Sequence, residues 1–421
     1  MTLLVLSNHN PVLEDGLHAA GHDVVVCLTK PNALARAQTN PGYELLTVSD
    51  WQSYTELVQL ARHLRGRIDR VETCWEGAIM AAGLVRDLLD LPGLSLRQSA
   101  GFLDKAIMKR RLSAAGIDVA RHQVVTAVDQ IPAAARVVGG WPLVVKPLAG
   151  FASTNTHVID SPEHLRDLDA ADVFDTATAT TAAFATERAY LGLADQNAFL
   201  VEEYIDVVAE YHADALWQDG VAQYHLPGRY NTPPLTGMGA TLGSWLIDPQ
   251  SADGSKVVAL AAAAAQTLGM RNGFTHAEVF HAADGRWLLG EIAARVGGGG
   301  IQQTIGHAHR IDVPALMVQV AAGRPVTTTL ADVPGVFGWA GTAVPAGTVQ
   351  SCADPDAVRR HPAVIDATVA ARPGMRGGPT STGLWAGLAG IAYLHTADVA
   401  AMRDAIAAVP DLYALTMRET A

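Results

Sequence analysis

Two glutamates, Glu278 and Glu291, are spaced so that they could share one metal ion. Between them, Asp284-Gly285 separates two β-rich runs, a pattern that predicts a hairpin with a two-residue turn. Such a turn places the two carboxylates directly opposite each other, with their Cβ atoms about 4.5–5.5 Å apart. Carboxylates this close repel each other unless a cation lies between them. The spacing therefore predicts a site for a hard divalent cation such as Mg²⁺ on one face of a hairpin.

A histidine and an arginine are expected on the same face, because side chains alternate along a strand. His276 precedes Glu278 on the first strand, and Arg295 follows Glu291 on the second. A guanidinium binds anionic oxygen bidentately, so this face suits a magnesium–triphosphate group. His276 could deprotonate an amine or bind an acid, although a structural histidine beside the carboxylates explains it equally well. A surface hairpin with salt bridges is the alternative for the whole motif, and the apolar neighbours of the two glutamates disfavour it.

Four consecutive glycines, Gly297 to Gly300, follow the hairpin directly. Such a run costs conformational entropy, so we expect a specific requirement for it. Bare backbone amides at the start of a helix beginning at Ile301 would bind a phosphate or a carboxylate. A plain flexible loop is the alternative interpretation.

The elements that position these residues are predicted from hydrophobic periodicity. In the first hundred residues, short apolar strands alternate with helices, which indicates an open, doubly wound α/β sheet. The first strand is not followed by Gly-x-Gly-x-x-Gly, so a dinucleotide-binding domain has little support. The predicted strands are Thr2–Leu6, Val24–Leu28, Glu44–Val48, Arg70–Cys74, Trp141–Pro147, Phe199–Ile205, Tyr211–Trp217, the hairpin Phe274–Val296, and segments near 336–344, 363–371 and 384–394. The predicted helices are Glu14–Ala20, Tyr54–Arg65, Asp104–Ala115, Ser255–Leu268, Ile301–Ala322 and Asp398–Val409.

The composition is that of a globular protein, with 421 residues, 49% of them hydrophobic and 17% charged. The formal net charge of −12 disfavours nucleic acid or an anionic membrane as a general partner. The three cysteines have no metal-ligand spacing, and the first residues lack a basic region. No apolar run reaches the roughly 18 residues of a membrane span. We therefore expect a cytoplasmic protein.

The motifs between about residues 100 and 325 occur in the order and at the spacing of the ATP-grasp superfamily, and the chain resembles its carboxylate–amine ligases. The family begins with an Asp-Lys pair on a helix, here Asp104-Lys105. A strand ending in Lys-Pro follows, here Lys146-Pro147. The family's hinge strand is similar to Leu200-Val-Glu-Glu-Tyr-Ile205, and the hairpin with the paired glutamates completes the set.

The resemblance implies a binding role for each matching residue. Lysines contact the ATP phosphates, backbone groups of the hinge strand read adenine, and acidic residues hold ribose and magnesium. The implied set is Lys105, Lys146 and Ser153 for phosphates; Glu202, Glu203, Tyr204 and Ile205 for adenine; Glu210 for ribose; Glu278 and Glu291 for Mg²⁺; and Arg295 for the reacting substrate. His276 joins the candidate set from its position on the same strand face.

The sequence departs from the family pattern in two places. The second acidic strand of the family often carries Glu-x-Asn, whereas Glu291-Ile-Ala293 lacks the asparagine, which leaves the number of bound Mg²⁺ ions open. The lid loop of the family is usually rich in glycine, whereas residues 148–155 contain one glycine, with Ser153 as the expected phosphate contact. Residues 150–195 are expected to form a lid that excludes water from a reactive intermediate.

The resemblance implies an α/β ATP-grasp fold with an N-terminal doubly wound, Rossmann-like domain and a C-terminal α+β subdomain. The expected units are an N-terminal α/β domain (1–98), a central lid subdomain (99–198), a nucleotide- and metal-binding subdomain (199–325) and a substrate-side subdomain (326–421).

The implied function is ATP- and Mg²⁺-dependent coupling of a carboxylate, expected to be that of an amino acid, to an amine, with release of ADP and phosphate. The alternatives are another ATP-grasp reaction, such as that of a carboxylase or a nucleotide-pathway ligase, and a non-catalytic ATP-binding regulator. No Met-Lys-Met biotin-attachment sequence occurs, which counts against a self-biotinylated carboxylase but not against a free carboxylase subunit. The retained glutamates, lysines and Arg295 count against the regulator. The implied partners are small-molecule carboxylate and amine substrates, without nucleic acid or membrane, and a homodimer is expected from the habit of the family.

Overall fold

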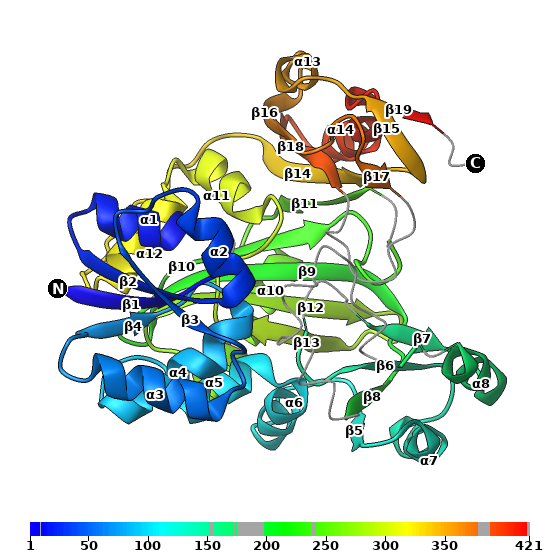
Figure 1. Cartoon of the computed structure of the whole chain (residues 1–421). Helices are drawn as coiled ribbons and strands as arrows, with labels where there is room; N and C mark the ends of the chain where they lie inside the picture. Colours follow the sequence, from blue (N-terminus) through cyan, green and yellow to red (C-terminus); the bar gives the residue numbers. More distant parts are fainter. Residues whose placement is uncertain are drawn as a thin grey trace.

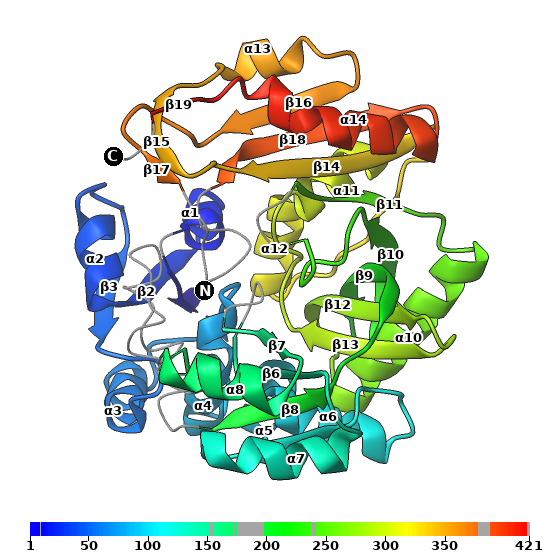
Figure 2. The same ribbon diagram turned by 90° about the vertical axis from the view of Figure 1, so that its right-hand side faces the viewer.

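The computed structural model describes residues 1–8, 10–150, 155–171, 173–174, 198–237, 241–377 and 388–418. The strands of these residues form four sheets, with four, eight, three and four strands. Figure 1 shows the N-terminal sheet beside the large central sheet, with the C-terminal strands above it. After a 90° turn, Figure 2 shows the N-terminal sheet, the large sheet and the second four-stranded sheet around one central region.

The N-terminal sheet is parallel and has the order β3-β2-β1-β4. Its strands are β1 (Thr2–Leu6), β2 (Asp23–Thr29), β3 (Glu44–Val48) and β4 (Arg70–Glu72). Its helices are α1 (Val12–Ala19), α2 (Lys30–Ala37), α3 (Tyr54–Leu64), the short 3₁₀ helix η1 (Glu76–Ala78) and α4 (Ile79–Leu89). Leu3 and Val5 pack with α1, whereas Leu4 and Leu6 pack with α3 and α4. Helices on both faces make this the doubly wound α/β unit that the alternation predicted.

A second sheet follows two helices, α5 (Leu96–Leu103) and α6 (Lys105–Ala114). It is antiparallel, with the order β5-β8-β6-β7. Its strands are β5 (His122–Val125), β6 (Leu143–Pro147), β7 (His157–Ile159) and β8 (Phe199–Glu203), and its helices are η2 (Val128–Gln130), α7 (Ile131–Val138) and α8 (Pro162–Ala170). Val145 and Val201 pack under these helices, so alternation directs Lys146 and Glu202 to the opposite face. Because β8 belongs to this sheet, the sheet extends past the unit boundary expected at 198/199.

The large sheet has the order β13-β12-β9-β10-β11-β14-β18-β16, and its paired strands are antiparallel. Its first five strands along the chain are β9 (Val207–Gln218), β10 (Val221–Tyr230), β11 (Leu242–Leu246), β12 (Gly273–Ala282) and β13 (Trp287–Ala293). Helix α10 (Ala252–Leu268) packs against Ala213, Ala277 and Val279. The intervening residues, such as His212 and Glu278, therefore face the opposite side of the sheet.

The C-terminal residues continue the large sheet rather than forming a separate one. Strands β14 (Val336–Ala343), β18 (Leu388–Thr396) and β16 (Val364–Val369) extend it beyond β11, and α14 (Val399–Leu412) packs on them. The remaining elements are α13 (Pro355–Arg359) and a small sheet of β15 (Gly347–Ser351), β17 (Arg376–Gly377) and β19 (Thr416–Arg418). The segments expected as separate units, 199–325 and 326–421, thus share one sheet.

The predicted helix over 301–322 is wrong as a single helix. It is two helices, α11 (Ile301–His309) and α12 (Val313–Ala321). Arg310 closes α11 in the left-handed region at φ 53°, and the Asp312 side chain caps α12 by accepting from the Ala315 amide at 2.9 Å. Pro314 lies in the first turn of α12, where a missing amide hydrogen costs little. None of the helices in the described residues is long and apolar enough to cross a membrane.

Candidate functional site

The β12–β13 hairpin brings the two predicted metal ligands together, although its turn differs from the prediction. Glu278 pairs directly with Glu291. The predicted two-residue turn is wrong, because the Ala282 amide donates to the Arg286 carbonyl at 2.9 Å and three residues form the loop. Gly285 ends this loop at φ 86°, as three-residue hairpin loops commonly require.

A β-bulge restores the register at the glutamates. Gly290 is the extra residue of β13, left out of the pairing between the turn and the Glu278–Glu291 pair. A Cβ at Gly290 would lie 2.5 Å from Cζ of Phe280, so a side chain there would displace the Phe280 ring. The Gly290 carbonyl accepts from Lys109 Nζ at 3.1 Å, which ties the hairpin to α6.

Lys105 lies against the β12–β13 hairpin at the first turn of α6. Its Nζ lies 2.7 Å from Glu291 Oε1 and donates to the Gly150 carbonyl at 2.5 Å. Burial raises the pKa of Glu278, and the charge of Glu291 raises it further. Burial acts the same way on Glu291, but the charges of Lys105 and Lys146 hold the pKa of Glu291 below its usual value. Without a cation, this pair of carboxylates therefore favours one ionised and one protonated member.

Lys146 reaches the same region from β6, with a buried counterion behind it. Glu202 Oε2 lies 2.8 Å from Lys146 Nζ, and Glu202 Oε1 lies 3.0 Å from Lys109 Nζ. Burial opposes ionisation of Glu202, but the charges of Lys109 and Lys146 lower its pKa to about 2. Among the described residues, Lys146 lines the cavity described in the next paragraph, and Lys109 does not. Lys109 therefore supports the carboxylate that orients Lys146.

A cavity of about 180 Å³ lies between the second sheet and the large sheet. Each predicted site residue in the described part of the chain lines it: Lys105, Lys146, Glu202, Glu203, Tyr204, Ile205, Glu210, His276, Glu278, Glu291 and Arg295. Ser153, the predicted phosphate contact, lies outside the described residues. The structure therefore gathers the described members of the predicted set in one place.

The last residue of β8, Glu203, and the two residues after it line one wall of the cavity. The Glu203 carboxylate is held by Arg121 at 2.8 Å and by Arg286 at 3.1 Å, so the side chain is already engaged. The neighbouring wall includes Tyr204 and Ile205. Backbone groups beside apolar side chains suit a planar base, which needs hydrogen bonds at its edge and apolar contact on its faces.

Glu210 occupies a buried position on β9, opposite Phe280 on β12. Burial raises the pKa of Glu210 well above its usual value, and the charge of Glu278 raises it further. A protonated carboxyl group can both donate to and accept from a hydroxyl. This environment suits contact with a sugar hydroxyl. Tyr230 and the segment 233–236 complete the wall, and the sequence analysis did not identify them.

His276 is held by Asp214, a residue that the sequence analysis did not identify. Asp214 Oδ1 lies 3.0 Å from His276 Nδ1, and Oδ2 lies 2.6 Å from His212 Nδ1. His212 Nε2 is 2.9 Å from Ser244 Oγ. Burial disfavours the Asp214 charge, but the two histidines hold its pKa below the usual range. Because an ionised carboxylate only accepts, Asp214 makes Nδ1 of His276 a donor and leaves Nε2 at 4.0 Å from Glu278 Oε1.

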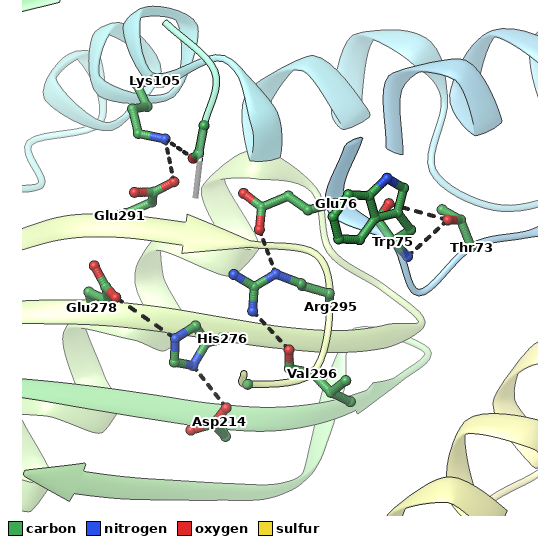
Figure 3. Close-up of polar contacts among 12 residues, drawn as sticks. Thr73, Trp75, Glu76, Lys105, Asp214, His276, Glu278, Glu291, Arg295 and Val296 are labelled. Carbon is green, nitrogen blue, oxygen red and sulfur yellow. Dashed lines mark hydrogen bonds and ion pairs between the residues drawn. The ribbon is translucent and has the colours of Figure 1, made fainter. Parts of the chain in front are cut away.

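Arg295 is held by a residue of the N-terminal unit (Figure 3). Its Nε donates to Glu76 Oε2 at 2.5 Å, and Nη1 donates to the Val296 carbonyl at 2.9 Å. Glu76 follows β4 at the start of η1 and is 2% exposed. The sequence offered one signal for it, a carboxylate just past the end of a parallel strand, where ligand sites of open α/β sheets lie.

Three of the four glycines have a local structural reason, and a Cβ at the fourth, Gly298, would meet no atom within 4 Å. A Cβ at Gly297 would lie 2.5 Å from Asp214 Oδ1, and a Cβ at Gly300 would collide with the Trp339 ring. Gly299 adopts φ 60°. Gly298 lines the cavity. The interpretation as an unconstrained flexible loop is therefore incomplete, and the anion site remains a prediction.

The ATP-grasp domain family matches residues 140–303, from the start of β6 to the first residues of α11. This chain contains an ATP-grasp domain. The L-arginine-specific L-amino acid ligase of Bacillus subtilis is 27% identical to this ATP-grasp chain over 285 residues, which are 68% of this chain and 65% of that enzyme. The D-alanine–D-alanine ligase of Geobacter sulfurreducens is 26% identical over 222 residues, 51% of this chain and 67% of that enzyme.

The whole chain also matches a solved structure. The crystal structure of an L-amino acid ligase from Bacillus licheniformis aligns with a TM-score of 0.76 at 16% identity, covering 100% of this chain and 98% of that one. The fold class and the family resemblance predicted from the sequence are confirmed.

Proposed function

We propose that this ATP-grasp protein is an ATP- and Mg²⁺-dependent ligase that joins the carboxylate of an amino acid to an amine and releases ADP and phosphate. The observation that carries the proposal is the facing pair Glu278 and Glu291 on the wall of one cavity, with Lys105 and Arg295 beside it. Phosphoryl transfer to a carboxylate needs ligands for a hard cation, a lysine for phosphate and a guanidinium for an anionic substrate. The curated relatives named above are amino acid ligases, which supports the choice of substrate class.

The proposed chemistry activates a poor electrophile. A carboxylate does not react with an amine directly, because oxide would have to leave. Transfer of the γ-phosphoryl group of ATP to a carboxylate oxygen releases ADP and forms an acyl phosphate. The amine nitrogen then attacks the acyl carbon, the bond to the phosphate oxygen breaks, and the nitrogen loses its proton. The contribution of the protein is positioning and charge neutralisation.

The donor set fits Mg²⁺. Glu278 and Glu291 face each other on the cavity wall and offer the hard carboxylate oxygens that Mg²⁺ prefers. When bound, Mg²⁺ would neutralise charge on the ATP phosphates. Ala293 lies opposite His276 and lines the cavity, and its side chain offers no ligand atom. We therefore assign the remaining coordination positions to water or phosphate oxygens.

The other roles follow from the position of each residue in the cavity. Lys105 and Lys146 bind phosphate oxygens, the backbone from Glu202 to Ile205 reads adenine, and Glu210 binds ribose. Arg295 and the Gly298 amide steady the acid and its acyl phosphate. His276 contacts the amine or the acid through Nε2. The partners are small-molecule acids and amines, and a homodimer and a cytoplasmic location remain predictions.

Phosphate release tests the proposal. The protein is incubated with ATP, Mg²⁺ and a panel of amino acids, singly and in pairs, beside a Glu291→Gln variant. The expected result is ADP and phosphate formation that depends on a pair of amino acids and is lost in the variant, with a dipeptide detected by mass spectrometry. ATP binding without pair-dependent turnover across the full set of proteinogenic amino acids would contradict the amino acid ligase.

A further inference from the structure

The Arg295 guanidinium lies at the junction of two structural units. Arg295 comes from the segment just after β13, which ends at Ala293, and Glu76 comes from η1 of the N-terminal unit. Figure 3 shows the Glu76 carboxylate and the guanidinium pointing toward each other, with Glu278 and Glu291 nearby. We propose that Glu76 is a positioning residue that fixes the Arg295 guanidinium in the substrate part of the cavity. The kinetic part of this proposal rests on the proposed ligase function.

Arg295 borders open space on two sides. A second cavity, of about 370 Å³, lies between the N-terminal unit and one end of the large sheet. Among the described lining residues, Arg295 is the member common to both cavities. A long side chain with open space on two sides can adopt several rotamers, because close-packed neighbours do not restrict it. Directed polar contacts must therefore make a large contribution to its orientation.

The contact with Glu76 has the geometry and burial to do this. The Glu76 carboxylate is 2% exposed, and the Arg295 side chain is 21% exposed. A carboxylate so deeply buried is strongly disfavoured unless a cation stays beside it, so the pair is maintained. Donation from Nε to Glu76 and from Nη1 to the Val296 carbonyl fixes the plane of the guanidinium. The N-terminal unit thereby contributes to a site whose other residues come from α6, the second sheet, the large sheet and their connecting segments.

Steady-state kinetics test the role through Glu76→Gln, which keeps the shape of the side chain and removes its charge. We expect the KM for the acid substrate to rise roughly 10- to 100-fold, as displaced positioning groups typically cause. The KM for MgATP should stay at the wild-type value. Glu14→Gln is the matched control, because Glu14 is 0% exposed and pairs with Arg36 inside the same unit. A merely structural role would make the two variants behave alike.

An Arg295→Ala background separates positioning from direct substrate contact. If Glu76 acts through Arg295, the Glu76→Gln substitution causes no further rise in KM once Arg295 is alanine. An equal rise in both backgrounds would overturn the proposal and make Glu76 a substrate ligand. An unchanged KM in the wild-type background would also overturn it.

Chemical labelling gives a readout that needs no turnover. Phenylglyoxal modifies accessible arginines, and the rate at Arg295 is followed by peptide mass spectrometry. We expect faster labelling of Arg295 in Glu76→Gln than in wild type and no change in Glu14→Gln. Equal rates in all three proteins would overturn the positioning role. Faster labelling in a protein that joins no amino acids would instead refute the ligase function and leave the positioning role standing.

Discussion

At the scale of single residues, the facing glutamates make metal binding sensitive to pH. The pKa of Glu278 is raised by burial and by Glu291, so Glu278 takes up a proton at a higher pH than an ordinary glutamate. A protonated carboxyl is a poor ligand, and Mg²⁺ must displace the proton to bind. We expect the Mg²⁺ affinity to fall as the pH is lowered while still above the usual glutamate value of about 4.5. Calorimetric titration of the ATP-bound protein with Mg²⁺ between pH 5 and 8 measures this affinity at each pH.

The Glu278→Gln variant is the control for this titration. An amide carries no titrating proton, so the variant should bind Mg²⁺ weakly and with a flatter dependence on pH. A wild-type affinity that stays constant down to pH 5 would show that Glu278 remains ionised without metal, contrary to the expected coupling.

At the same scale, the sequence identified residues whose role depends on local alternation. Glu278 and Glu291 were placed opposite each other from alternation and an assumed turn length, although a one-residue change in the turn alone would shift this register. The predicted turn was wrong by one residue, and the bulge at Gly290 compensated for it. Glu76 could not be found in this way, because its contact with Arg295 spans 219 residues of sequence. Contacts between distant elements leave no periodic signal.

At the scale of elements, Glu202 joins α6, β6 and β8 through its two lysines. Replacing it with glutamine would leave Lys109 and Lys146 as buried like charges. We expect Glu202→Gln to lower the free energy of unfolding by about 3–5 kcal/mol, the typical cost of breaking a buried ion pair. Glu203→Gln, next to it, is the control. The partners of Glu203, Arg121 and Arg286, are 62% and 41% exposed and stay hydrated. We therefore expect Glu203→Gln to lower the free energy of unfolding by about 1 kcal/mol or less.

The sign of the pH effect follows from the lowered pKa of Glu202. Its folded value of about 2 lies below the unfolded value, so its contribution to stability is present above about pH 4.5 and is lost as the pH falls toward 2. Urea unfolding at several pH values checks this. The difference in stability between wild type and Glu202→Gln should be largest near neutrality and shrink below pH 4.5. A difference independent of pH would show that lost packing, rather than charge, causes the destabilisation.

Elements with strong local signals were predicted best. β1 and β3 match the predicted bounds, because each is a short apolar run next to a helix or turn. β10 was not predicted, since it carries Pro227-Gly228 in its interior, residues that usually break strands. The structure explains Gly228, because a Cβ there would collide with the His212 ring. Tertiary contact overrides propensity at this strand.

At the scale of the whole molecule, the C-terminal residues are integral to the site-bearing sheet. β14 pairs with β11, and Trp339 is fully buried in one core with Ile301 and Ile305 of α11. The Trp339 ring also leaves no space for a side chain at Gly300. The family resemblance suggested a separate fourth unit over 326–421, and strand pairing between elements distant in the sequence cannot be deduced from composition.

Shortening the chain tests this integration. A protein ending at Asp332 would expose the β11 edge and the apolar surface that Trp339 covers, so we expect it to aggregate or to lose cooperative unfolding and MgATP binding. Removal of residues 416–421 is the control, because it takes away β19 at the edge of the three-stranded sheet and leaves the large sheet intact. Calorimetry and circular dichroism follow both proteins. If the chain ending at Asp332 melted cooperatively and still bound MgATP, the C-terminal strands would be an independent unit, and their pairing with β11 would not be needed to form the nucleotide site.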